Sequence, residues 1–238
     1  MKHLIYRAVA AILPPKLAGR VDYWIGHHRH FYPYGSAMNG QTARAELVRE
    51  MIVSCKPKLL VETGTFRGTT TEWFAGFGIP MITIEINKRF FEFSRLRLSA
   101  FKHVEVKRGN SVEVMEYVGQ TYRHIDRPIL FYLDAHWEEY LPLRKEIELI
   151  FEDFTYPIVL IDDFKVEEDD GYGFDNYGPG KSLTMDYVLV ARTPKLFMFF
   201  PSVEGKFETG LRRGCVIITS HPELADKLNH ISLLRRWP

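Results

Sequence analysis

Two apolar runs in the second half of the chain are each followed by residues that could do chemistry. Asp134 and His136 come shortly after the run Ile129–Leu133, and Asp162 and Asp163 stand at the end of the next run. Ligands of open α/β sheets bind beyond the carboxyl ends of the strands, so these side chains are expected in one pocket. Three carboxylates at such a place repel one another unless they are protonated or neutralised by a cation.

The three aspartates therefore predict a metal site. A hard divalent ion with oxygen ligands, Mg²⁺ first, would resolve the repulsion, and water or substrate would complete its coordination. Asp134, Asp162 and Asp163 are the predicted ligands. Two simpler roles stay open, an N-cap for Asp163 and a structural strand-end residue for Asp162.

His136 and its neighbour Asp134 are the catalytic candidates. A histidine whose pKa lies near neutrality is suited to remove the proton of a hydroxyl group. A divalent ion at the adjacent aspartates would lower the pKa of that hydroxyl. An orienting or packing role beside Trp137 explains His136 equally well.

A glycine turn earlier in the chain predicts a cofactor site. In VETGTFRGTT (Val61–Thr70), Gly64 and Gly68 flank a strand-to-helix turn. Glu85 follows Gly64 at the distance of an acidic residue that binds ribose hydroxyls. The spacing matches neither a dinucleotide fingerprint nor a P-loop. Glu62 would repel a pyrophosphate but could meet an ammonium or sulfonium group, which favours S-adenosylmethionine. The alternative is a plain helix-entry turn with Glu62 bonded to nearby amides.

The elements that must position these residues alternate between strands and helices. Seven short apolar runs predict strands, and the segments between the first five are long enough for crossover helices. This order predicts an α/β, doubly wound, mostly parallel sheet. The last two runs are joined by a glycine-rich segment too short for a convincing crossover, which predicts a hairpin and an antiparallel last strand. The strands are Leu59–Glu62, Met81–Glu85, Val104–Val106, Ile129–Leu133, Ile158–Ile161, Leu196–Phe200 and Val216–Thr219, and the helices are Thr42–Val53, Thr70–Phe77, Lys88–Phe101, Glu138–Phe151 and Ser182–Ala191.

Two sequence motifs resemble those of a known family. VETGTFRG followed by ITIEI resembles motif I and the acidic-loop motif of class I S-adenosylmethionine-dependent methyltransferases. The resemblance implies a Rossmann-like sheet of seven strands with an antiparallel last strand. It places Glu62 near the methionine amino group, Gly64 beneath the ligand and Glu85 on the ribose. It further implies cofactor contacts from the turn and from the loop after the third strand, on the adenine side, at Thr63, Thr65, Gly68, Asn110 and Ser111.

The acidic pattern resembles a narrower group. D-x-H followed by a later DD is similar to the metal-dependent O-methyltransferases of the macrocin O-methyltransferase type, in which Mg²⁺ binds two neighbouring oxygens of a sugar. The sequence thus predicts an S-adenosylmethionine- and Mg²⁺-dependent O-methyltransferase that acts on a sugar, a glycan or a small polyhydroxylated molecule. Two alternatives stay open: a metal-dependent hydrolase or oxygenase on the same fold, and a non-catalytic nucleotide-binding protein.

Two segments are candidates for the acceptor pocket within a single domain of residues 1–238. Residues 1–53 are expected to form an N-terminal helical acceptor or cap segment, which includes the aromatic stretch His27–Gln41, and residues 54–238 the Rossmann-like core. The second candidate is the acidic, glycine-rich loop Lys165–Ser182. The aromatic rings of the two segments are predicted stacking surfaces for the acceptor: Phe31, Tyr32, Tyr34, Tyr172, Phe174 and Tyr177. A plain solvated loop remains the alternative for that segment.

Composition limits the class of protein. The 31 Lys and Arg residues balance 30 Asp and Glu residues, which argues against a nucleic-acid-binding protein. The two cysteines predict reduced, buried thiols in a cytoplasmic protein. The apolar stretch Leu4–Leu13 is too short to cross a membrane and contains Arg7. It predicts a first helix packed on its own domain, with weak contact to a membrane surface as the alternative. The sequence leaves the oligomeric state open.

Overall fold

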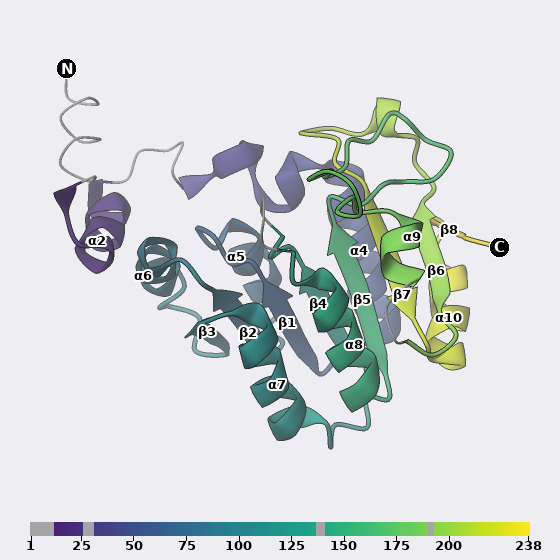
Figure 1. Ribbon diagram of the computed structural model, residues 1–238, viewed down its shortest axis with the longest axis horizontal. Helices are drawn as coiled ribbons and strands as arrows, with labels where there is room; N and C mark the ends of the chain where they lie inside the picture. Colours follow the sequence, from purple (N-terminus) through teal and green to yellow (C-terminus); the bar gives the residue numbers. More distant parts are fainter. Residues whose placement is uncertain (1–11, 26–30, 137–140, 190–192) are drawn as a thin grey trace.

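The computed structural model describes residues 12–25, 31–136, 141–189 and 193–238. Its centre is a mixed sheet in the order β3-β2-β1-β4-β5-β7-β6-β8 (Figure 1). The first five strands pair in parallel, β7 runs antiparallel to both β5 and β6, and β8 runs antiparallel to β6. The strands are β1 (Leu59–Thr63), β2 (Met81–Glu85), β3 (Val104–Arg108), β4 (Ile129–Leu133), β5 (Pro157–Asp162), β6 (Phe197–Pro201), β7 (Cys215–Thr219) and β8 (Leu234–Arg236).

The seven predicted strands and the hairpin of the last two are confirmed. The predicted total of seven is wrong, because β8 adds an eighth strand at the edge of the sheet. It pairs through only three residues, two of them arginines, so it has no apolar pattern that a sequence could show. β1, β2, β4 and β5 are buried along their whole length, as strands covered on both faces must be.

Helices cover both faces of the sheet (Figure 1). Side chains of α4, α5 and α10 pack with one face, and those of α7, α8 and α9 pack with the other. The helices are α2 (Pro15–Ile25), α4 (Thr42–Cys55), α5 (Thr69–Ala75), α6 (Lys88–Arg97), α7 (Ser111–Tyr122), α8 (Leu143–Asp153), α9 (Met185–Leu189) and α10 (Pro222–Asn229), with short 3-10 turns η1 (Pro33–Gly35), η2 (Ala37–Gly40) and η3 (Gly205–Phe207). No residue range was predicted for three of these helices, α2, α7 and α10.

Two helix starts test the predicted caps. Asn87 caps α6 as predicted, because its side chain accepts hydrogen bonds from the backbone N–H groups of Arg89 and Phe90. The predicted capping box of Thr69 and Glu72 is wrong. Gly68, in the left-handed conformation at φ 73°, precedes α5 instead, and Glu72 forms an ion pair with Arg97.

Some sequence predictions are only partly covered by the described residues. The stretch Leu4–Leu13 lies mostly outside them, as do the first residues of the helix predicted from Glu138. The predicted boundary between residues 53 and 54 falls within the last turn of α4. Both cysteines are free and buried, as predicted. Within the described part of the chain, no helix combines the length and the apolar character that a membrane crossing requires.

Candidate functional site

The carboxyl ends of β2, β1, β4 and β5 bring the predicted site residues to one edge of the sheet. Register fixes the arrangement: Glu62 of β1 lies beside Thr83 of β2 and Tyr132 of β4, and Leu133 lies beside Ile161 of β5. The residues that follow these strands, Asp134 among them, therefore emerge next to one another. The predicted cofactor residues lie at or shortly after the ends of β1, β2 and β3, and the predicted metal residues lie at or shortly after the ends of β4 and β5.

Glu62 is a deeply buried carboxyl group at the cofactor end. It is 1% exposed, and its Oε2 accepts hydrogen bonds from the hydroxyls of Thr71 and Thr83, the latter at 2.5 Å. Burial raises the pKa of Glu62 to about 7, although the two hydroxyls lower it. The partners of Glu62 are thus side-chain hydroxyls, and not the amides that the plain-turn alternative supposed.

The turn after β1 requires glycine for two reasons. Gly64 has φ 88°, and a Cβ atom there would stand 2.2 Å from the backbone oxygen of Asp134. The turn therefore packs closely against the backbone that follows β4. This contact brings the cofactor end and the metal end together. Phe66, two residues on, also has a positive φ of 48°. Thr65 is buried, and its hydroxyl lies 2.5 Å from that of Thr83.

Glu85 stands at the end of β2 with both oxygens engaged. Its Oε2 accepts from the backbone N–H of Phe66 and its Oε1 from that of Asn87, each at 2.6 Å. Burial raises the pKa of Glu85 to about 7, while these amides lower it. Each carboxylate oxygen has a second lone pair, so the two bonds leave acceptor capacity for a ribose hydroxyl.

The loop after β3 leads directly into the N-terminus of α7. Asn110 caps α7, because its side chain accepts a hydrogen bond from the backbone N–H of Val112 at 2.9 Å. Ser111 is buried. Its hydroxyl and that of Thr63 both lie near the carboxyl group of Glu146 from α8. Burial raises the pKa of Glu146 to about 7, although these hydroxyls lower it. No motif or spacing in the sequence singles out Glu146.

At the other end of the site, Asp134, His136 and Asp163 form a compact group. One ligand atom from each lies within 4.8 Å of the others. The Nε2 atom of His136 is 3.9 Å from Oδ1 of Asp134 and 3.9 Å from Oδ2 of Asp163. His136 is 4% exposed, and its Nε2 has no hydrogen-bond partner among the described residues. A buried nitrogen without a partner between two carboxylates fits the donor set of a divalent ion.

Burial and neighbouring charges shift the pKa values of all three members of this group. Burial raises the pKa of Asp134 well above its ordinary value, and the carboxylates of Asp162 and Asp163 raise it further. Burial, with Asp162 next, raises the pKa of Asp163 to about 7. Burial lowers the pKa of His136 to about 4, so its imidazole is neutral at pH 7, the form that binds a metal.

Asp162 lies outside this group, turned toward α4. It forms a buried ion pair with Arg44 and accepts a hydrogen bond from the hydroxyl of Tyr132. The backbone N–H of Asp163 also donates to Asp162 at 2.8 Å, and the side chain of Asn39 does so at 3.4 Å. Protein donors therefore already occupy the oxygens of this predicted metal ligand.

Three residues that the sequence did not point to hold the metal end in place. The guanidinium of Arg213 donates to Oδ1 of Asp163 at 2.6 Å and forms an ion pair with Asp175. Gln41 bonds the backbone of Arg213 in both directions, at 3.0 and 2.7 Å. The third residue, Arg44, lies on the buried face of α4. A charged residue at a buried helix position requires a partner of opposite charge, and this position could have indicated one.

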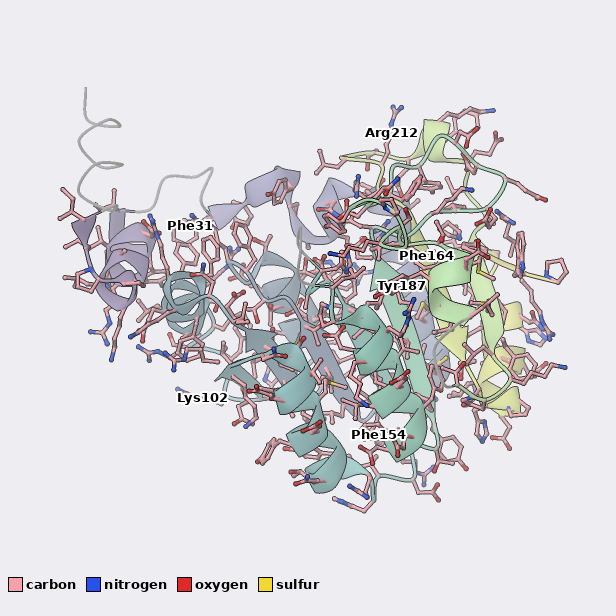
Figure 2. The ribbon with its side chains drawn as sticks, viewed as in Figure 1. Phe31, Lys102, Phe154, Phe164, Tyr187 and Arg212 are labelled. Carbon is pink, nitrogen blue, oxygen red and sulfur yellow. The ribbon has the colours of Figure 1, made fainter. Side chains whose placement is uncertain are left out.

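The aromatic residues predicted as stacking surfaces differ in whether their rings are exposed or packed against the protein. Tyr172 is 5% exposed and donates to the backbone oxygen of Val203, so the prediction that its ring is offered to an acceptor is wrong. Phe31 packs against Tyr23 and Phe93 near α6 (Figure 2). Tyr32 and Tyr34 are exposed, and Phe174 and Tyr177 are partly exposed.

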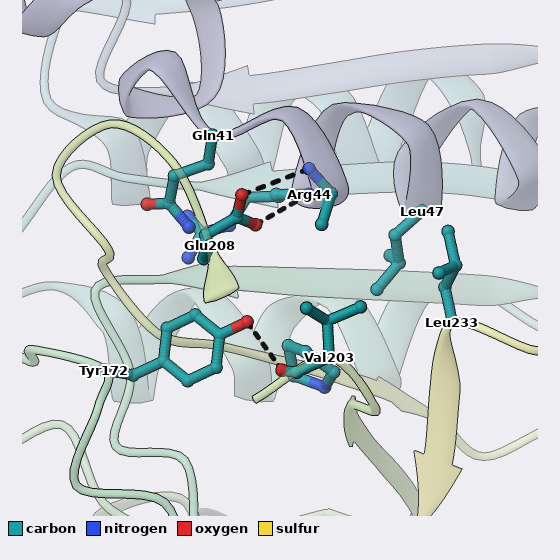
Figure 3. Close-up of a pocket in the computed structure, with 9 residues that line it drawn as sticks. Gln41, Arg44, Leu47, Tyr172, Val203, Glu208 and Leu233 are labelled. Atoms are coloured by element: carbon teal, nitrogen blue, oxygen red, sulfur yellow. Dashed lines mark hydrogen bonds between the residues drawn. The ribbon is translucent and has the colours of Figure 1, made fainter. Parts of the chain in front are cut away.

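A small cavity lies behind the metal end and is not an acceptor site. Its volume is about 10 Å³, room for about one water molecule. Figure 3 shows how it is closed: Glu208 accepts from the first backbone N–H groups of α4, including that of Arg44 at 3.0 Å, and Tyr172 donates to Val203. The cavity therefore lies at a hydrogen-bonded junction between α4 and the loops that flank the site.

Comparisons with known proteins support the architecture. No protein-family model matches the sequence, and no curated protein sequence matches it either. Among solved structures, a Klebsiella pneumoniae protein described as an O-methyltransferase matches at a TM-score of 0.54 with 14% identity, over 90% of this chain and 94% of that one. The O-methyltransferase from Bacillus cereus in complex with SAH matches at 0.52 with 15% identity, over 90% and 96%. Cofactor-bound Rv0187 from MTB matches at 0.52 with 15% identity, over 87% and 89%. The chain has the α/β Rossmann-like methyltransferase fold.

Proposed function

We propose that the chain is an S-adenosylmethionine- and Mg²⁺-dependent O-methyltransferase that acts on a hydroxyl of a sugar, a glycan or another small polyhydroxylated molecule. One observation carries the proposal. Ligand atoms of Asp134, His136 and Asp163 converge beside the glycine turn that follows β1. The same edge of the sheet carries Glu62 and Glu85, and the solved structures with this fold include O-methyltransferases.

The cofactor end supplies the groups that would hold S-adenosylmethionine, whose sulfonium carries the methyl group to be transferred. Glu62 offers a carboxylate for the methionine amino group, and Glu85 offers acceptors for the ribose. Thr63, Gly64, Thr65 and Gly68 form the turn between them, and Asn110 and Ser111 lie on the predicted adenine side. Because Glu62 and Glu85 are held by hydroxyls and amides, their geometry is set before a ligand arrives.

The metal end supplies the groups that would hold the acceptor through a divalent ion. Asp134, His136 and Asp163 are the proposed ligands, and a bound Mg²⁺ would lower the pKa of an acceptor hydroxyl. Asp162 stays a predicted ligand, although its oxygens face Arg44 and Tyr132. A vicinal diol suits this arrangement because two neighbouring oxygens can chelate one ion.

The reaction needs a base as well as alignment. In the transfer, the acceptor oxygen forms a bond to the methyl carbon while the carbon–sulfur bond breaks, and the hydroxyl proton passes to the protein. Asp134 and His136, 3.9 Å apart, are the proposed proton acceptors. Asp134 would take the proton on the carboxylate oxygen that does not bind the ion, and His136 would take it on Nε2 where the ion is held by the aspartates alone. The aromatic segment before α4 and the loop Lys165–Ser182 flank this edge and are the proposed acceptor-binding segments. The macrocin-type preference for sugars is part of this proposal.

An acceptor screen with a labelled methyl donor tests the function. We expect transfer to sugars that carry a vicinal diol, weak or no transfer to their mono-deoxy analogues, and loss of activity with a chelator. Asp163→Ala should remove the activity, whereas Asp226→Ala on the exposed side of α10 should retain it. Full activity in the presence of chelator, equal rates on diols and mono-deoxy sugars, or methylation of nitrogen alone would contradict the proposal.

A further inference from the structure

Helix α2 is oriented with its apolar residues toward solvent. Small and acidic residues, Ala18, Gly19 and Asp22, form its buried face. Trp24 is 76% exposed, Ile25 55% and Leu17 46%, and Ile12 just before the helix is 84% exposed. An amphipathic helix of a globular domain normally buries its apolar side, so this arrangement is the reverse of the usual one.

The orientation of α2 is fixed by its contact with α6. A Cβ atom on Gly19 would stand 2.2 Å from the backbone oxygen of Arg89, so the two helices touch at their backbones. Asp22 accepts from the guanidinium of Arg89 at 2.6 and 2.9 Å. Tyr23 packs edge-on to Phe93. These contacts use the polar and small side of α2, which leaves Leu17 and Trp24 on the outside.

Basic residues are interleaved with the apolar ones on the same outward side. Lys16 and Arg20 are one turn apart and flank Leu17, and Arg20 and Trp24 are again one turn apart. Lys88 and Arg95 of α6 are also exposed. The carboxylate of Glu92 pairs with Arg20 and Arg95, and that of Asp22 pairs with Arg89. The cations of α2 and α6 named here therefore outnumber the carboxylates, although the whole chain carries a net charge of only +1.

We propose that the outward side of α2 docks onto a membrane leaflet that contains anionic phospholipids. An interfacial helix combines exposed apolar side chains, a tryptophan and flanking cations, so that the apolar groups enter the headgroup region while the cations meet phosphates. The excess of exposed cations favours this occupant over a second copy of the chain, because pairing two such surfaces would bring their cations together. α2 would lie on the leaflet beside α6, at the end of the sheet away from β8 (Figure 1).

Flotation with lipid vesicles tests the proposal on the full 238-residue chain. We expect binding to vesicles of phosphatidylcholine mixed with phosphatidylglycerol, little binding to phosphatidylcholine alone, and weaker binding as salt is raised. Trp24→Ser should weaken binding about tenfold or more. The double variant Lys16→Gln with Arg20→Gln should also weaken it about tenfold or more. Tyr117→Ser and Lys227→Gln, at exposed positions on other helices, should bind as the wild type does.

A second readout separates membrane contact from misfolding. Trp24→Phe keeps an apolar ring and should retain vesicle binding, but it should lose most of the fluorescence quenching that doxyl-labelled lipids cause in the wild type. Failure of the wild type to bind anionic vesicles would overturn the proposal, as would equal binding by Trp24→Ser. A change in molar mass on Trp24→Ser, measured by light scattering without lipid, would assign the surface to a second copy of the chain instead.

Discussion

The two ends of the candidate site hold their charges in different ways. At the cofactor end, Glu62 and Glu85 accept hydrogen bonds from hydroxyls and backbone amides. At the metal end, the Nε2 atom of His136 faces two carboxylates and has no partner among the described residues. Glu62 and Glu85 thus have partners within the protein, whereas the metal end brings two carboxylates together around a buried nitrogen that has none among the described residues. The cofactor end should therefore work without a metal and the metal end should not.

The largest expected effect comes from removing a proposed metal ligand. Asp163→Ala should lower turnover roughly a thousandfold, because the acceptor hydroxyl would lose both its orientation and its acidification. Affinity for SAH, measured by calorimetry, should change less than about threefold, since Glu62 and Glu85 are untouched. A matched loss of SAH affinity would show that the two ends are not independent.

The buried pair of Arg44 and Asp162 gives the next largest effect. Arg44→Met should lower the free energy of unfolding by about 3–5 kcal/mol, because it leaves Asp162 buried without its cation. Arg49→Met, at a half-exposed position on the same helix, should cost at most about 1 kcal/mol. Adding Asp162→Asn to Arg44→Met should recover part of the loss. Equal denaturation midpoints for Arg44→Met and Arg49→Met would contradict the structural role of the pair.

Glu85→Gln perturbs the cofactor end alone. It should weaken SAH binding by about 1–3 kcal/mol, because an amide cannot replace a carboxylate that accepts from Phe66, Asn87 and a ribose hydroxyl together. Calorimetry measures this change, and metal binding should be unaffected. Unchanged affinity for SAH would remove the ribose role of Glu85.

The smallest effect is a change in how stability depends on pH. Glu146 has a pKa of about 7 in the folded chain, against about 4.3 for an unfolded glutamate. The folded state thus binds more protons between these values, and the free energy of unfolding should fall as pH rises through this window. Glu146→Gln should reduce that fall by about 1.4 kcal/mol per pH unit within the window, as measured by chemical denaturation at several pH values. Parallel pH curves for wild type and variant would show that Glu146 does not retain its proton.

Much of the fold could be predicted because each buried strand is one contiguous apolar run. The edge strand β8 could not, since it contains two arginines and takes its place only by pairing with β6. Thr69 has the residue type of a cap, but the left-handed Gly68 decides where α5 begins.

The location of the site could be predicted, because the order of the strands and the positions of the residues at their ends determine it. The sequence brings Asp134, His136 and the pair Asp162–Asp163 to one edge, but it does not say which side chains face one another. Arg44, far earlier in the chain, forms an ion pair with Asp162. The group of possible metal ligands therefore consists of Asp134, His136 and Asp163. The bonds of Gln41 to Arg213 depend on loops that meet only in the folded chain.

Asp134, His136 and Asp163 are proposed to bind a divalent ion independently of the cofactor end. Titration of the free Mn²⁺ signal by electron paramagnetic resonance tests this binding most directly, with wild type, Asp163→Ala and Glu85→Gln compared in the same buffer. We expect one bound ion in wild type and in Glu85→Gln, and none in Asp163→Ala. Absence of Mn²⁺ binding in wild type, or equal binding in Asp163→Ala, would contradict the account.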